Sequence, residues 1–367
     1  MSVAGMDYDL STESWQIVRS LLPADWRSSA RELGALTRAR GVKDEEALLQ
    51  LLMMHTAGGL SLKQTSMRAA ELGIAEVSSV ALFKRLRSAE PWLRHLSAQM
   101  VQGMAAKMKE LPQSGRRWRI MDATDIVEPG RTGSHWNLHY SLRLPELACD
   151  HFEVSDQQGG ESFVRLPVKA GDVVIADRGY AHRRGIAYLM EAKADVLVRV
   201  RFRNALFDEN EDPLPLLEKL RGLKQGRCGE WSVSFVWEDK RYKARLCAVR
   251  KSALHAARAR KKALNKSRRK GQQIKPLTLE LADYVLILTT LPKTDYSTNE
   301  ILEIYRCRWQ VELAFKRLKG LLAIGHVPKT DPDSARAWMQ GKVLAALLID
   351  KILRQGRFFS PWGFVCE

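Results

Sequence analysis

Cysteine is scarce in this sequence, and the few cysteines present are poorly spaced for binding metal. The 367 residues include five, and no two of them form a Cys-x-x-Cys pair. An odd number of well-separated cysteines argues against a disulfide framework and against a zinc site. We therefore expect reduced thiols and a cytoplasmic location. The five are Cys149, Cys228, Cys247, Cys307 and Cys366.

Long hydrophobic runs are also missing. No window of about 18 residues is both apolar and uncharged, so we expect no membrane-spanning helix. The N-terminal sequence, MSVAGMDYDLSTESW, lacks the basic start and the apolar middle of a secretory signal. We therefore expect no signal peptide.

Acidic residues are outnumbered by basic ones. Lys and Arg total 59 against 42 Asp and Glu, which gives a net charge of +17. Such an excess favours a polyanionic partner, and nucleic acid before a membrane surface. Residues 250–275 contain eleven Lys or Arg and no Asp or Glu. This run could be a solvated helix or loop, but its uncompensated charge favours a contact with polyphosphate.

The N-terminal third predicts helices, with apolar residues at helical spacing up to about residue 112. Residues 61–72 and 78–88 form a helix-turn-helix pattern, in which Gly73 ends the first helix and Ser78 or Ser79 caps the second. A plain helical hairpin with a solvated basic face is the alternative. If the pattern binds DNA, the second helix would present three basic residues to phosphates or base edges: Lys84, Arg85 and Arg87.

The middle of the chain changes to short strand-like runs after a linker at 111–117, and predicts an α/β core. Residues 203–292 look like a β-rich insertion, and two helices follow it, at 298–322 and 333–354. The expected strands of the core are 117–122, 135–144, 147–154, 172–177 and 194–202, with a helix at 182–193. Those of the insertion are 230–237 and 241–249, and a further strand is expected at 282–292.

Three carboxylates lie where such a core would bring them together. Asp122 and Asp177 each end a strand, and Glu312 lies on the helix at 298–322. Three carboxylates so near one another should not all ionise without a cation among them. Their oxygens suit Mg²⁺ or Mn²⁺ as ligands. Two such ions would suit in-line displacement at phosphorus.

Each of these carboxylates also has an ordinary structural explanation. Asp122 could begin an Asx-turn, and Asp177 could cap the following helix. Asp125 and Glu128 remain alternatives to Asp122. Glu312 with Lys316 has the i,i+4 spacing of a surface ion pair.

Four polar residues share one side of the helix expected at 298–322. On a helical wheel they form a stripe about 60° wide, beside the apolar face. Residues of opposite sign at such a rim can be held rigidly and still reach a ligand. The four are Tyr305, Arg308, Glu312 and Lys319.

This spacing, Y-(2)-R-(3)-E-(6)-K, resembles the signature of bacterial insertion-sequence transposases of the DDE type, the group that excises through a DNA hairpin. DATD at 122–125 resembles that family's first aspartate motif, and ADRGY at 176–180 resembles its second. The resemblance runs from about residue 40 to 355.

The resemblance implies a ribonuclease H-like catalytic core, residues 113–202 and 293–367, interrupted by a β-rich insertion at 203–292. An all-helical DNA-binding domain, residues 1–112, precedes the core. Asp122, Asp177 and Glu312 would be the catalytic residues and would hold two divalent ions. Tyr305, Arg308 and Lys319 would contact phosphates.

The implied chemistry has three steps. One strand is nicked, the freed 3′-OH attacks the opposite strand to form a hairpin, and after opening the 3′-OH joins target DNA. The partners would be double-stranded DNA, as terminal inverted repeats and target, and a second copy of the chain in a synaptic complex. In this family a tryptophan of the insertion can hold a flipped base. Trp231 and Trp237 are candidates, although core packing is the commoner role for either.

The C-terminal region after Lys319 is shorter than is common in the family. It suggests an alternative in which the chain is a truncated, non-catalytic DNA-binding regulator of transposition. A general nuclease on the same fold is a third possibility, against which the helical N-terminal region argues.

Overall fold

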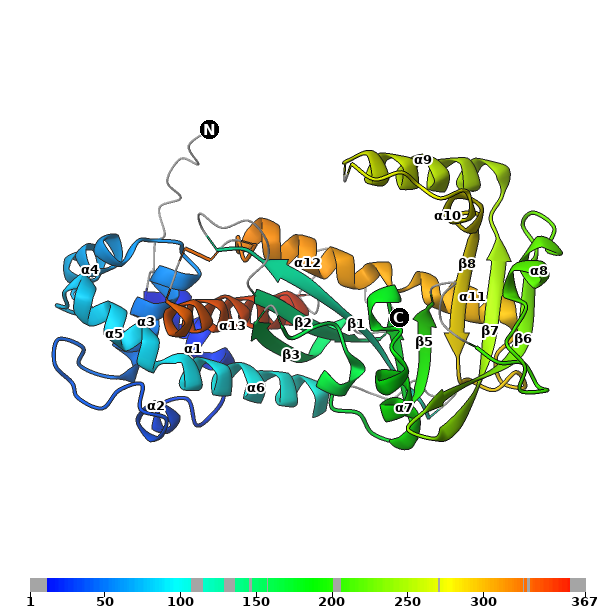
Figure 1. The fold of residues 1–367 in the computed structure, drawn as a ribbon. Helices are drawn as coiled ribbons and strands as arrows, with labels where there is room; N and C mark the ends of the chain where they lie inside the picture. Colours follow the sequence, from blue (N-terminus) through cyan, green and yellow to red (C-terminus); the bar gives the residue numbers. More distant parts are fainter. Residues whose placement is uncertain are drawn as a thin grey trace.

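The computed structural model describes residues 12–106, 115–128, 136–144, 147–156, 158–200, 206–269, 271–325, 327–328 and 331–356. Most of the expected linker at 111–117 and the last eleven residues lie outside these ranges. Figure 1 shows helices at one end of an elongated molecule, a mixed sheet through its middle, and the strands of residues 203–292 at the other end. No helix in the described ranges is long and apolar enough to cross a bilayer.

The centre of the molecule is an eight-stranded sheet in the order β3-β2-β1-β4-β5-β8-β7-β6. β1 is parallel to β4, and β4 is parallel to β5, whereas the other neighbours are antiparallel. The strands are β1 (Arg117–Ile126), β2 (Trp136–Arg143), β3 (Ala148–Asp156), β4 (Asp172–Ala176), β5 (Asp195–Arg199), β6 (Cys228–Trp237), β7 (Lys240–Arg250) and β8 (Tyr284–Thr289).

Both faces of the sheet are covered, which explains the nearly continuous apolar sequence of β4 and β5. Alternate residues point to opposite faces. Ile120 and Ile175 belong to the core shared with the N-terminal and C-terminal helices, whereas Met121 and Ala176 belong to a second core. The second core is completed by α7 (Arg183–Glu191), α8 (Leu216–Arg221) and a 3₁₀ turn, η1 (Phe163–Arg165).

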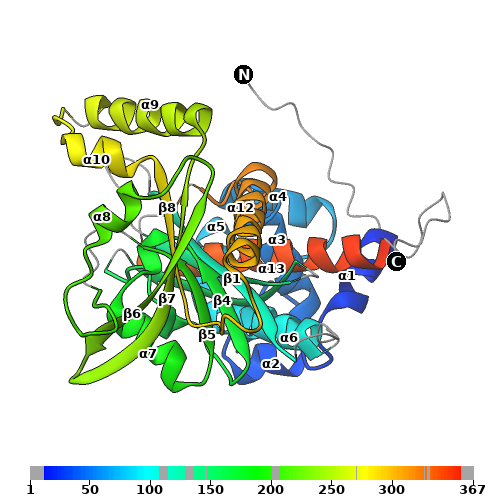
Figure 2. The same cartoon turned by 90° about the vertical axis from the view of Figure 1, so that its right-hand side faces the viewer.

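The strands of residues 203–292 continue this sheet instead of forming a sheet of their own. β7 pairs with β8 along six residues, and β8 pairs with β5. The basic run becomes α9 (Ala253–Arg269), which is followed by α10 (Pro276–Leu281). Figures 1 and 2 show α9 and α10 projecting beyond the sheet at the end formed by β6, β7 and β8.

Helices dominate the N-terminal third, as the sequence predicts. Ser78 caps α5 by accepting a hydrogen bond from the backbone N–H of Ala81, and Gly73 follows α4 with φ of +64°. These residues form the turn expected between the two helices. The six helices are α1 (Thr12–Leu21), α2 (Ser28–Glu32), α3 (Glu45–Thr56), α4 (Leu62–Glu71), α5 (Ser79–Ser88) and α6 (Glu90–Ala106).

The final helix, α13 (Pro332–Gly356), packs against α3, α5 and α6 and so joins the C-terminal part of the chain to the N-terminal helices. The contact with α3 is very close. A Cβ at Gly341 would lie 2.5 Å from the hydroxyl oxygen of Thr56, so only glycine fits there.

The prediction of a single helix at 298–322 is wrong, because this segment forms two helices. α11 (Thr298–Arg306) ends, and α12 (Trp309–Leu321) begins after Cys307 and Arg308. Backbone N–H groups at 307, 308, 310 and 311 bond carbonyls three residues earlier, so the chain tightens into a 3₁₀-like turn. Tyr305 therefore lies on α11, and Arg308 is the N-cap residue of α12.

Candidate active site

The register of the sheet brings Asp122 and Asp177 together. Met121 pairs with Ala176 in the parallel β1–β4 ladder, and each aspartate is the next residue in the chain. Asp177 follows the end of β4 as expected, whereas the strand end expected at Asp122 is wrong, because β1 continues to Ile126. Asp122 remains in β1, where its Oδ1 accepts a hydrogen bond of 2.9 Å from the N–H of Ala123. Asp177 caps the 3₁₀ turn η2 (Arg178–Tyr180). Asp177 therefore caps this turn and not the expected helix, because His182 is the N-cap residue of α7. The carboxylate of Asp177 also reaches the cluster described next.

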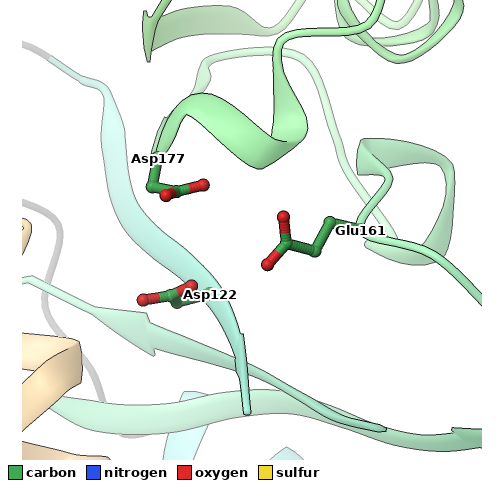
Figure 3. A group of neighbouring side chains, drawn as sticks. All are labelled: Asp122, Glu161 and Asp177. Carbon is green, nitrogen blue, oxygen red and sulfur yellow. The ribbon is translucent and has the colours of Figure 1, made fainter. Parts of the chain in front are cut away.

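A third carboxylate, which the sequence pattern did not reveal, completes a compact cluster with these two. Glu161 lies in the loop between β3 and η1, and one oxygen each of Asp122, Glu161 and Asp177 lie within 4.8 Å of one another. Figure 3 shows the three side chains converging from separate elements. Among the residues that the structure describes, this is the one group of three acidic or metal-ligating side chains so close together.

Glu312 is close to this cluster but not part of it. Its side chain is 52% exposed and is paired with the guanidinium of Arg308. The same guanidinium lies 3.5 Å from Oδ2 of Asp122. Arg308 therefore bridges Asp122 and Glu312, and its positive charge stands where a cation between them would stand.

The structure excludes from the acidic cluster the two carboxylates that the sequence left as alternatives to Asp122. Asp125 is exposed, and Glu128 is buried and accepts a hydrogen bond of 2.8 Å from the indole N–H of Trp136. Neither belongs to the acidic cluster. Glu312 forms its ion pair with Arg308, one turn earlier, and not with Lys316.

The other residues expected near the site lie at different distances from it. Tyr305 is partly buried, and desolvation raises its pKa to about 12, with Arg308 and Arg199 opposing that rise. Its hydroxyl also interacts electrostatically with Asp122 and Asp177. Lys319 is exposed on α12, about three turns beyond Arg308, and so lies apart from the cluster.

The basic residues of α5 are partly engaged within the chain. Arg85 donates to the backbone carbonyls of Arg38 and Arg40, and Arg87 pairs with Asp331 and Asp333. Lys84 is exposed.

The two tryptophans of β6 pack against the core. Trp231 and Trp237 are partly buried against the cluster that also contains Phe235 and Tyr242. Core packing, the commoner role, is what the structure shows for both.

Burial and crowding raise the pKa of Asp122 to about 6. Desolvation is the largest cause, and the charges of Asp177 and Glu312 add to it. The N–H of Ala123 and the charge of Arg308 act in the opposite direction. Burial disfavours the ionised form of this carboxyl, so the carboxyl binds a proton more readily than usual. A bound cation would stabilise the ionised form in place of that proton.

This pKa predicts that Asp122→Asn stabilises the cation-free protein, and does so more at pH 8 than at pH 5. The folded-state pKa of about 6 exceeds the unfolded value of 3.8, so ionised Asp122 destabilises the fold increasingly as the pH rises through this range. We expect a gain in the free energy of unfolding on the order of 2 kcal/mol at pH 8. Urea unfolding in chelator at both pH values measures it, and an equal gain at both would contradict the assignment.

This chain resembles known proteins over most of its length. The family described as "Transposase DDE domain" matches residues 151–348, a stretch that contains Glu161, Asp177, Arg308 and Glu312. This match covers more than half of the chain.

Several curated transposases are similar along almost the whole chain. The transposase for insertion sequence element IS421 of Escherichia coli is 36% identical over 361 residues, which cover 96% of this chain and 97% of that protein. The transposase for IS231E of Bacillus thuringiensis subsp. finitimus is 23% identical over 91% of this chain and 78% of its own length. Such coverage gives no support to the alternative of a truncated regulator. The chain belongs to the DDE transposases of insertion sequences.

Proposed function

We propose that this transposase cleaves DNA at terminal inverted repeats, forms a hairpin intermediate and transfers the freed 3′ end to target DNA, with Asp122, Asp177 and Glu312 as its catalytic residues. The observation that supports this most directly is the parallel β1–β4 register, which sets Asp122 beside Asp177. Glu312 is held next to Asp122 by the shared Arg308 guanidinium.

The residues present fit divalent cations such as Mg²⁺ or Mn²⁺. Three carboxylates supply hard oxygen ligands. The hydroxyl of Tyr180 is buried nearby without a hydrogen-bond partner. When bound, two such ions would activate the attacking oxygen and stabilise the leaving oxygen of an in-line displacement at phosphorus.

The cationic residues around this site would bind the DNA backbone. Arg308 already lies against Asp122, so a phosphate entering the site would meet its guanidinium. Tyr305 would donate its hydroxyl to an adjacent phosphate, because a tyrosine with a raised pKa stays protonated at neutral pH. Lys319, farther along α12, would contact the backbone at a distance from the reacting phosphate.

We infer a ribonuclease H-like catalytic core from the strand order β3-β2-β1-β4-β5, with β2 antiparallel to its neighbours. The proposed division is a DNA-binding region at 1–112, a core at 113–202 and 293–367, and an insertion at 203–292. Lys84, Arg85 and Arg87 would face DNA from α5. Pairing of two element ends would require a homodimer, acting on DNA in the cytoplasm.

A supercoiled donor plasmid carrying the element's two inverted repeats tests the proposal. With Mg²⁺ we expect nicked, hairpinned and excised products, resolved on denaturing gels. Specific binding of the repeats without any of these products would contradict the catalytic function. Cleavage without regard to the repeat sequence would indicate a general nuclease instead.

The basic helices would add affinity for DNA beside the active site. A cavity of about 1010 Å³ lies between α9, α10 and the strands β5 and β8 and reaches Arg178, next to Asp177; none of its lining residues is acidic. Its cationic lining consists of Arg178, Arg199, Lys251, Lys262, Lys266 and Lys275.

Neutralising four exposed residues of α9 to glutamine should therefore weaken DNA binding about tenfold to hundredfold. The logarithmic dependence of affinity on salt should also become shallower, by roughly 0.9 for each phosphate that the protein no longer neutralises. Fluorescence anisotropy at several salt concentrations measures both. An unchanged salt dependence would place DNA elsewhere. The four residues are Arg258, Lys261, Lys262 and Lys266.

Arg260, on the same helix, provides the comparison. It pairs with Asp283, whose side chain is only 10% exposed, whereas none of the other four has an ion pair within the described part of the chain. Arg260→Gln should lower the free energy of unfolding. Its affinity for DNA should change less than that of the fourfold variant.

A further inference from the structure

We propose that Glu161 is a metal-ligating residue of this centre, and that Asp122, Glu161 and Asp177 together form the cation position that fills in the DNA-free protein, without a contribution from Glu312. The inference rests on the proposed function. It adds a fourth carboxylate to the three proposed above and assigns the carboxylates to two different positions.

The geometry separates the two positions. Oxygens of Asp122, Glu161 and Asp177 already lie within 4.8 Å of one another, and Figure 3 shows the three side chains turned toward one another. Between Asp122 and Glu312, by contrast, the guanidinium of Arg308 contacts both carboxylates. A cation must therefore displace Arg308 to join Asp122 to Glu312.

Space for the Glu161 carboxylate is provided by Gly179, in the second aspartate motif. A Cβ at this position would lie 1.4 Å from Oε2 of Glu161 and 3.0 Å from Oδ1 of Asp177. The φ angle of Gly179 is not in the left-handed region, so backbone conformation alone does not require glycine. A methyl group at this position would instead displace the end of the Glu161 side chain, which occupies the same volume.

The loop that carries Glu161 is held in a defined place. The guanidinium Nε of Arg165 donates to the carbonyl of Gly160 at 3.2 Å. Phe163, two residues after Glu161, is fully buried, and its ring lies 5.3 Å from that of Tyr180. Glu161 is therefore directed at the aspartates by a packed loop.

Tyr180 supplies an independent sign of a ligand. Its side chain is fully buried, and its hydroxyl has no hydrogen-bond partner, which is costly for a phenol. Burial raises the pKa of this hydroxyl, and the charges of Asp122, Glu161 and Asp177 raise it further, so it lies within electrostatic reach of all three. A water molecule held by a cation among these carboxylates would offer the missing acceptor.

The test is a titration of the full-length protein with Mn²⁺ in the absence of DNA, followed by calorimetry or by the electron paramagnetic resonance of free Mn²⁺. Glu161→Gln should weaken binding about tenfold or more, whereas Glu312→Gln should change it less than about threefold. Glu303→Gln, on the exposed face of α11, serves as the control and should bind like the wild type. Unchanged binding in Glu161→Gln would overturn the proposal, and so would an equal loss in Glu312→Gln.

Two glycine variants test the same geometry with every carboxylate retained. Gly179→Ala should displace the Glu161 carboxylate and weaken Mn²⁺ binding as Glu161→Gln does. Gly160→Ala, beside Glu161, should have no effect, because nothing lies within 4 Å of the added methyl group. In a Glu161→Ala background the Gly179→Ala change should cost less than about twofold in affinity. A full additional loss there would show that Gly179 acts independently of Glu161.

Cleavage of repeat DNA by the wild type, measured in parallel, separates this inference from the proposed function. If the wild type cleaves but Glu161→Gln binds Mn²⁺ normally, only the role of Glu161 fails. If the binding pattern is as expected but the wild type does not cleave, the cation position stands and the proposed function fails.

Discussion

Asparagine at position 122 or 177 should reduce Mg²⁺-dependent cleavage of repeat DNA about a thousandfold or more. Each change keeps the size of the side chain and removes the charge that would hold a cation. Asp122 is the more sensitive position, because it lies both in the carboxylate cluster and against Arg308. Specific binding of the repeats should be nearly unchanged, since the proposed DNA contacts are cationic. Time courses of strand nicking, with binding measured by gel shift, check both statements.

The matched control is Asp125→Asn. Asp125 lies three residues after Asp122 on the same strand, but its side chain is exposed and outside the cluster. The Asp125→Asn variant should cleave repeat DNA at a rate within about threefold of the wild-type rate. Full activity in Asp122→Asn, or a loss in Asp125→Asn as large as in Asp122→Asn, would refute the assignment of Asp122.

Much of the core could be predicted because short stretches of sequence are enough to identify its strands. β4 and β5 are short apolar runs, and Asp122 and Asp177 follow the residues that pair in the β1–β4 ladder. The helix break at Cys307 could not be predicted, since residues 304–311 contain neither proline nor glycine. Its cause is a set of i→i−3 hydrogen bonds, which side-chain periodicity does not report.

Glu161 was missed for a related reason. It lies in a loop, away from any strand end, and only the folded chain places it beside the aspartates. The available clue was Gly179, whose role becomes apparent only when the Glu161 carboxylate is seen against it. Likewise, the joining of β8 to β5 depends on pairing between segments far apart in sequence, so the strands of 203–292 looked like a separate unit.

A second large effect is expected for Arg308→Ala, which should lower cleavage about a hundredfold while tightening Mn²⁺ binding in the absence of DNA. Cleavage should fall because the guanidinium would no longer meet the phosphate that reacts. Binding of the cation should strengthen by about threefold to tenfold, since a competing positive charge between Asp122 and Glu312 is removed. Arg306→Ala is the control, because Arg306 is exposed and pairs only with Glu303 among the described residues.

The opposite signs of these two effects make Arg308 informative. A merely structural arginine would weaken cleavage and cation binding together when removed, and that result would contradict the prediction. If Arg308 does occupy the place of a cation until DNA arrives, a phosphate that draws its guanidinium away would free Asp122 and Glu312 to bind a second ion. Repeat DNA should then tighten Mn²⁺ binding in the wild type, and this coupling should be reduced in Arg308→Ala, because binding free energies at linked sites are reciprocal.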